Sequence, residues 1–147
     1  MKKMNNKGFS LVELIVVVLI MAIIAVALAP QVMKWVENSR KSTDIENYNA
    51  LIEAATVCST NEKVIAQVKN AGSTGILVTM NSTNTTGFTG DFKSAMDITL
   101  PGWEATKITS GDWKGSTFNI LITNSGDAKG IVVSKGSAGH VPTKDFE

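Results

Sequence analysis

The sequence predicts an α+β fold, in which a long N-terminal α-helix packs on a small C-terminal antiparallel β-sheet. Three observations support this fold class. Residues 14–33 form an apolar run without any charge, the following segment repeats apolar residues at helical spacing, and residues 117–123 alternate apolar and polar side chains. Because the helical and strand-like patterns occupy separate parts of the chain, we expect separate helical and sheet layers.

The apolar run is long enough to cross a membrane. At a rise of about 1.5 Å per residue, roughly twenty helical residues span a hydrocarbon core of about 30 Å. Lys2, Lys3 and Lys7 precede the run, which predicts a cytoplasmic leader with the bulk of the chain outside. Pro30 lies inside the run and removes one helical hydrogen bond, so we expect a kink or local loosening there.

The helix is expected from Phe9 to about Cys58, and its second half is amphipathic. Its apolar face should lie on the sheet; the residues of that face are Ile45, Tyr48, Ile52 and Ala55, with Leu51 and Cys58 beside them. The charged residues of this half are expected to form a solvated face with weak local pairs, such as Glu37 with Lys41. They are Lys34, Glu37, Arg40, Lys41, Asp44, Glu46 and Glu53.

Shorter elements are expected after Ser59. Residues 61–70 predict a helical turn, and the Gly-, Ser-, Thr- and Asn-rich stretch 72–90 predicts a loop, with a possible edge strand at Ile76–Met80. Three strands are predicted at Ile98–Leu100, Thr117–Thr123 and Gly130–Lys135, the last two forming a hairpin.

Within the hairpin, Phe118, Ile120 and Ile122 should face the core. Trp103 and Trp113 are expected to belong to the core as well, rather than to a ligand platform. Cys58 is the one cysteine, and its place on the apolar face favours a small buried hydrophobe over a cross-link between subunits.

Composition argues against an enzyme, a cofactor protein or a nucleic-acid-binding protein. The net charge is +1, and without the three leader lysines it is −2, since 11 basic residues then face 13 acidic ones. The single histidine, His140, belongs to no metal-ligand pattern, and no phosphate-binding loop is present. Asp91, Asp112, Asp127 and Asp145 have no calcium-ligand spacing and are expected to be solvated turn residues.

The motif at residues 7–13, Lys-Gly-Phe-Ser-Leu-Val-Glu, opens the apolar run. It resembles the cleavage site of type IV pilins and of the related pseudopilins, with Ser10 in place of the commoner Thr. The resemblance covers roughly residues 1–60 and implies cleavage between Gly8 and Phe9 and methylation of the new amine on Phe9. The alternative is signal-peptide cleavage after Ala29, which Pro30 disfavours on the primed side of the cut.

Glu13 is a carboxylate at the edge of the apolar run, where an unpaired charge costs about 2.5 to 3.5 kcal/mol. We expect it to pair with the amine of Phe9 in a neighbouring subunit, and the resemblance implies a role of Glu13 in subunit docking. Pairing with its own first helical turn is the alternative. Pilins carry a proline where this chain has Pro30, which implies loosening of the helix in the filament.

The expected organisation is a prepilin leader (1–8), a transmembrane and filament-core helix (9–33) and a soluble head (34–147) that includes the amphipathic half-helix. The expected function is that of a structural subunit of a type IV pilus, serving adhesion, motility or DNA uptake. Its partners would be other copies of the chain, a prepilin peptidase, the assembly machinery and, before assembly, membrane lipid. The precursor would lie in the cytoplasmic membrane and the pilus on the cell surface. Alternatives are a secretion or competence pseudopilin, a minor pilin, or a monomeric membrane-anchored binding domain.

Overall fold

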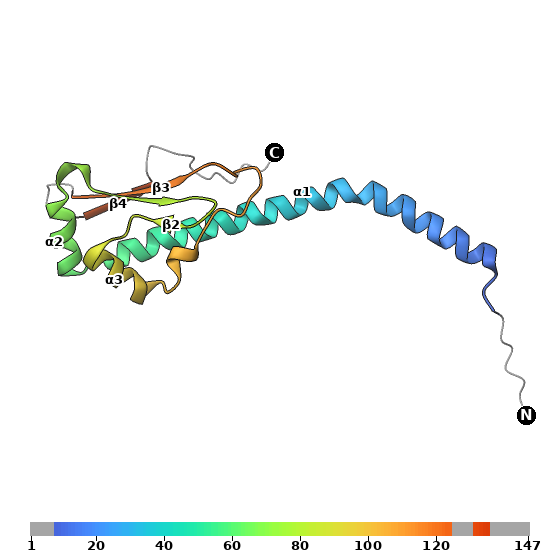
Figure 1. Ribbon diagram of the computed structural model, residues 1–147, viewed down its shortest axis with the longest axis horizontal. Coiled ribbons are helices and arrows are strands. Elements are labelled where there is room, and N and C mark those ends of the chain that lie inside the picture. Colours follow the sequence, from blue (N-terminus) through green and yellow to red (C-terminus); the bar gives the residue numbers. More distant parts are fainter. Residues whose placement is uncertain (1–7, 125–130, 136–147) are drawn as a thin grey trace, which may run out of the picture. The chain divides into compact units, whose positions relative to one another are not determined.

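The computed structural model describes residues 8–124 and 131–135. Figure 1 shows one long helix, α1 (Leu11–Cys58), followed by shorter elements. These are α2 (Glu62–Asn70), the 3₁₀ turn η1 (Gly72–Thr74), β1 (Ile76–Met80), β2 (Thr85–Thr86), α3 (Gly90–Thr99), the 3₁₀ turn η2 (Trp103–Ala105), β3 (Phe118–Asn124) and β4 (Ile131–Lys135). The chain divides between Val36 and Glu37 into two units, each described by itself below.

The first unit contains the apolar part of α1. Every large apolar side chain from Phe9 to Val36 is at least 45% exposed, and the helix is continuous through Pro30. Among the described residues, α1 is the one helix long and apolar enough to cross a membrane. This part of the chain therefore presents an apolar surface on all sides, which water does not favour.

The second unit, from Glu37 onward, contains an antiparallel sheet with the strand order β2-β1-β3-β4. Ile76 pairs with Ile122 across β1 and β3, and Ile122 pairs with Val133 across β3 and β4. The strands predicted at 117–123 and 130–135 are confirmed to within one residue, as is their antiparallel pairing. The residues that connect them, 125–130, lie outside the described part of the chain.

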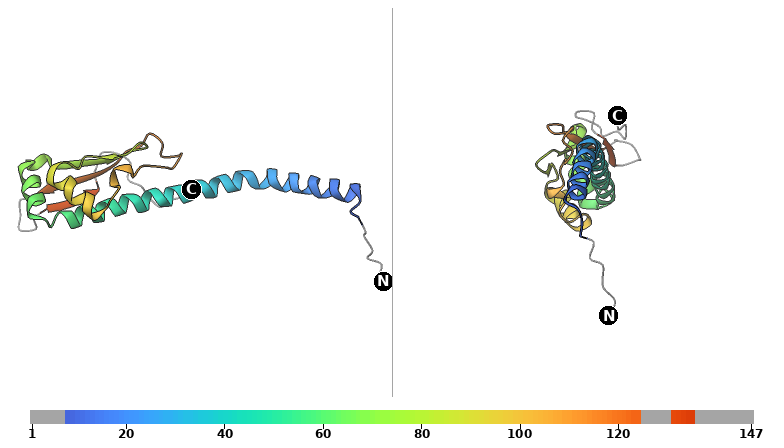
Figure 2. Two further views of the ribbon diagram at one scale, coloured as in Figure 1. Left: turned by 60° about the horizontal axis from the view of Figure 1, so that its bottom comes forward. Right: turned by 90° about the vertical axis from the view of Figure 1, so that its right-hand side faces the viewer.

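The second half of α1 packs against this sheet, as predicted (Figure 2). Phe118, Ile120 and Ile122 are completely buried. The Tyr48 ring meets Phe118 edge-on, with 5.6 Å between ring centroids, and its hydroxyl donates to the Asn119 carbonyl at 2.6 Å. Because a buried hydroxyl without a partner would be costly, this hydrogen bond fixes Tyr48 against β3.

The predicted apolar face of α1 is confirmed. Ile45, Tyr48, Leu51, Ala55 and Cys58 are buried, and Ile52 is half-buried and packs against the same core. The Cys58 thiol lies 3.3 Å from the hydroxyl oxygen of Thr99 and is shielded from solvent. Cys58 is therefore a small core residue.

The predicted strand at Ile98–Leu100 is wrong, because Ile98 and Thr99 end α3. Phe92 and Met96 lie four residues apart and are both fully buried, whereas Ile98 is 83% exposed, so the helical period decides the conformation.

The start of α3 is capped from another helix, α2. Gln67 accepts from the Phe92 amide at 2.9 Å and donates to the Thr89 carbonyl at 2.8 Å.

The stretch 72–90 also differs from the prediction, since it holds two strands instead of a loop with one edge strand. β1 lies between β2 and β3, and the edge of the sheet is the two-residue β2. Thr85 of β2 is buried, and its hydroxyl donates to the Thr106 carbonyl at 2.6 Å. Gly87 adopts φ +118°, where a Cβ would collide with the Leu77 carbonyl, so the close approach to β1 requires glycine.

Two other predictions are confirmed. α2 occupies residues 62–70, and the side chain of Asn61 caps it by accepting from the Lys63 amide at 3.0 Å. Trp103 and Trp113 both belong to the core. Trp103 packs edge-on against Phe88, with 4.9 Å between ring centroids.

The second unit should fold without the membrane half of the chain, because its core is built from the later part of α1 and the sheet. We expect a fragment of residues 34–147 to be monomeric, with cooperative unfolding and dispersed amide proton signals. Circular dichroism, proton NMR and sedimentation would measure this. An unfolded fragment would contradict the division into an apolar helix and a separate head.

Candidate functional site

The residues around the predicted cleavage point are exposed. Gly8, Phe9 and Ser10 precede the first turn of α1, and Phe9 is 83% exposed. A Cβ added at Gly8 would meet no atom within 4 Å. The fold of this chain therefore does not require glycine at position 8.

Glu13 bonds to its own first helical turn. One of its carboxylate oxygens, Oε2, accepts from the Ser10 backbone N–H at 2.9 Å, which is the reach-back of an N-terminal capping box. This matches the same-chain alternative. A carboxylate has lone pairs on both oxygens, so the cap to Ser10 does not use all the acceptor capacity of Glu13. Between Gly8 and Met33 it is the only charged side chain.

Pro30 sits in an uninterrupted α-helix. Together with Gln31, Lys34 and Trp35 it lines a shallow surface hollow. Loosening of the helix at Pro30 in a filament stays a prediction.

Comparison with protein families finds the prokaryotic N-terminal methylation motif at residues 3–29. The chain carries the type IV pilin and pseudopilin signature. The motif indicates a structural protein, processing by a prepilin peptidase and a membrane-anchored precursor. Searches of curated proteins and of solved structures found no match. The match includes Gly8, Phe9 and Glu13 and ends just before Pro30, so it describes the start of this pilin-like chain and not its second unit.

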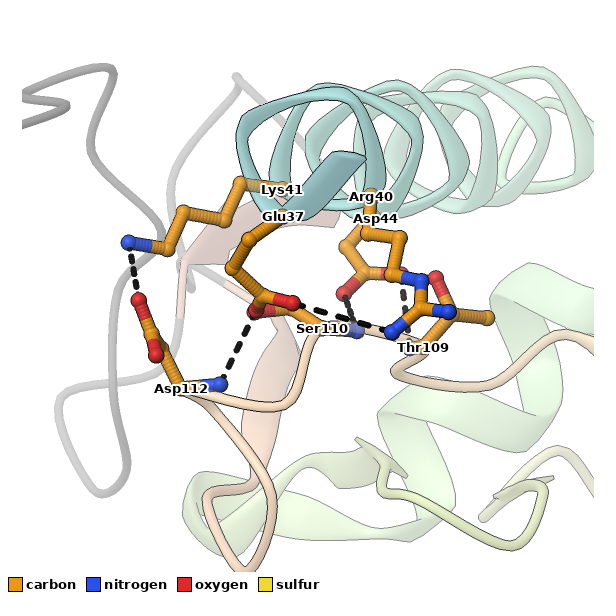
Figure 3. Close-up of polar contacts among 7 residues, drawn as sticks. All are labelled: Glu37, Arg40, Lys41, Asp44, Thr109, Ser110 and Asp112. Atoms are coloured by element: carbon orange, nitrogen blue, oxygen red, sulfur yellow. Dashed lines mark hydrogen bonds and ion pairs between the residues drawn. The ribbon is translucent and has the colours of Figure 1, made fainter. Parts of the chain in front are cut away.

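In the second unit of this pilin-like chain, the structure reveals a polar cluster that the sequence reasoning missed (Figure 3). It joins the first turns of α1 beyond Val36 to the loop 109–112, and we call it the α1–loop clasp. Its members are Glu37, Lys41 and Asp44 on α1 and Thr109, Ser110 and Asp112 on the loop.

Asp44 is the centre of the clasp. Its side chain is fully buried and accepts three hydrogen bonds, each at 2.8 Å, from the Thr109 amide, the Thr109 hydroxyl and the Ser110 amide. A buried carboxylate is tolerable only when its oxygens are hydrogen-bonded in this way. Asp44 therefore fixes the loop to α1.

Glu37 and Lys41 extend the clasp toward solvent. Glu37 accepts from the Ser110 hydroxyl at 2.5 Å and from the Asp112 amide at 3.0 Å. These hydrogen bonds hold the pKa of the Glu37 carboxyl below its ordinary value, and the one from the Ser110 hydroxyl has the largest effect. The Lys41 ammonium pairs with Asp112 at 2.6 Å.

The prediction that these charges form a solvated face is wrong for Asp44, and the predicted pair of Glu37 with Lys41 is replaced by contacts to the loop. Asp112, predicted to be a solvated turn residue, pairs with Lys41.

The helical spacing of the clasp residues on α1 could have indicated that they face the core side. Residues 37, 41 and 44 continue the series 48, 51, 55 and 58 at intervals of three and four, so the clasp lies on the same helix face as the core.

Within residues 8–124 and 131–135, no three His, Cys, Asp or Glu side chains lie close enough together to hold a metal ion. The predictions for His140, Asp127 and Asp145 concern residues outside these ranges.

Replacing Asp44 by alanine should destabilise the head by about 2 to 4 kcal/mol, because two backbone amides and a hydroxyl lose their acceptor in a buried place. Urea unfolding of the 34–147 fragment would measure the loss. Asp44→Asn, which keeps one acceptor oxygen, should fall between wild type and alanine. Glu46→Ala, at an exposed position of the same helix, is the matched control and should change stability little.

The clasp should also make stability depend on pH. The Glu37 pKa is lower in the folded than in the unfolded chain, so its contribution is present above the ordinary glutamate pKa and is lost as pH falls through the folded value. We expect the stability lost between pH 6 and about pH 3 to be smaller in Glu37→Gln than in wild type. Equal losses in the two proteins would contradict this assignment.

Proposed function

We propose that this chain is a type IV pilin that polymerises into a surface filament after cleavage between Gly8 and Phe9. The observation that carries the proposal is the apolar part of α1, whose side chains are exposed all around the helix directly after the methylation motif. A membrane can cover this surface in the precursor, and neighbouring helices can cover it in a filament.

The proposed roles of the N-terminal residues follow from this arrangement. The peptidase cuts the exposed Gly8–Phe9 bond, and methylation then modifies the Phe9 amine. Glu13 pairs with the amine of a neighbouring subunit, since it is the one charged side chain between Gly8 and Met33. Its carboxylate has a second oxygen besides the one that accepts from Ser10. Loss of a hydrogen bond at Pro30 lets the helix loosen during packing.

In this proposal, the domains are the leader (1–8), the membrane and filament-core helix (9–33) and the head (34–147). The head stays outside the membrane and covers the filament surface. Adhesion, motility and DNA uptake are the roles that such a filament could serve.

The direct test is to shear fibres from cells that produce the protein and to determine the intact mass of their subunits. We expect a chain that begins at Phe9 and carries one added methyl group. A mature chain beginning at Met1 or at Pro30 would overturn the proposal. Fibres in which this chain is rare would favour a minor pilin, and processed chain confined to the membrane would favour a pseudopilin.

A further inference from the structure

The apolar part of α1 ends at two residues with a different chemistry. Lys34 and Trp35 follow the charge-free run directly, and Trp35 is 64% exposed. By contrast, Trp103 and Trp113 are 2% and 9% exposed. A large aromatic side chain left in the open beside a basic residue is the composition found at membrane–water interfaces.

The position of these residues along the helix fits a bilayer. Trp35 comes 22 residues after Glu13, which corresponds to about 33 Å of helix at a rise of about 1.5 Å per residue. The hydrocarbon core is about 30 Å thick. With Glu13 at one boundary, Trp35 therefore reaches the other.

Lys34 is also available for a ligand. Among the described residues none forms an ion pair with Lys34, whereas Arg40 pairs with Glu37 and Lys41 with Asp112. Lys34 and Trp35 line the hollow beside Pro30 and Gln31, which combines polar and apolar groups on one surface. A lipid headgroup offers the matching chemistry, with a phosphate for the ammonium and an acyl boundary for the indole ring.

We propose that Pro30, Gln31, Lys34 and Trp35 form an interfacial anchor, which binds the phospholipid headgroups of the outward-facing leaflet and sets the depth of the unassembled subunit. The proposal rests on the membrane span of the proposed function, and it adds how deep the helix lies in the bilayer. Lys34 contacts the phosphate, and the Trp35 ring lies at the level of the acyl ester groups. A subunit that enters a filament must release this contact.

Depth-dependent fluorescence quenching tests the anchor. The full processed chain is placed in vesicles of phosphatidylcholine and phosphatidylglycerol, which carry a spin label either near the headgroup or deep in the acyl chain. Subtracting the signal of Trp35→Phe isolates Trp35, because Trp103 and Trp113 remain in both proteins. We expect the shallow label to quench Trp35 at least about twofold more than the deep label, as for a ring at the headgroup level.

Two comparisons sharpen the test. Ile24 lies halfway between Glu13 and Trp35 in the sequence, so Ile24→Trp in the Trp35→Phe background should show the opposite preference, for the deep label. Lys34→Glu should weaken the quenching of Trp35, since its charge repels phosphate, and Lys34→Arg should preserve it.

The outcomes separate the two proposals. Deep quenching of the tryptophan at position 24 with equal or no quenching of Trp35 would overturn the anchor and leave the membrane span intact. Absence of quenching at both positions would overturn both. Shallow quenching of Trp35 that Lys34→Glu leaves unchanged would overturn the phosphate contact.

Discussion

Replacing Gly8 by valine should leave the protein as an uncleaved and unassembled precursor. A protease must approach the backbone closely at the bond it cuts, and glycine is the residue without a Cβ to obstruct that approach. A displacement of about 1 Å from the productive geometry can cost about 100-fold in rate, so we expect processed chain to fall to traces. Immunoblots and N-terminal sequencing of the membrane fraction would measure this.

The structure makes Gly8→Val a clean experiment. Gly8 is exposed, and a Cβ at this position would meet no atom within 4 Å, so the substitution should not disturb the fold of the chain itself. Gly8→Ala, with a smaller side chain, should be processed slowly instead of not at all. Normal amounts of mature protein from Gly8→Val would contradict cleavage at this bond.

The elements that could be predicted from the sequence are those with a strong local pattern. The long helix, the hairpin strands and the inward alternation of Phe118, Ile120 and Ile122 follow from periodicity, and the structure confirms them. The N-terminal site was predicted from a contiguous motif, and the match to residues 3–29 supports its family.

The elements that could not be predicted depend on contacts between distant residues. α3 begins where the Gln67 side chain caps it from α2, and no local sequence pattern around residue 90 predicts those hydrogen bonds. Asp44 is a charged residue at a core position, tolerable only because the loop at 109–110 supplies three donors. Its spacing marked the correct face, but a carboxylate without a visible partner is ordinarily assigned to solvent.

Glu13 is the residue on which filament assembly should depend most strongly. In a filament its carboxylate would lie among apolar helices, next to the Phe9 amine of a neighbour. Breaking a buried ion pair from one side typically costs about 3 to 5 kcal/mol, because the remaining charge is left uncompensated. We expect Glu13→Ala as the sole subunit to yield no fibres in electron micrographs, while immunoblots show processed protein in the membrane at normal levels.

Glu13→Gln separates the charge from the helix cap, and Glu53→Ala serves as a control. Glu13→Gln retains an oxygen that can accept from the Ser10 amide, the bond seen at 2.9 Å, but loses the attraction to the amine. It should therefore preserve the first turn of α1 and still impair assembly. Glu53→Ala removes an exposed acid later in the same helix and should assemble normally. If Glu13→Gln assembled as well as wild type while Glu13→Ala failed, assembly would require the helix cap and not the charge. Abundant fibres from Glu13→Ala would refute docking through this residue altogether.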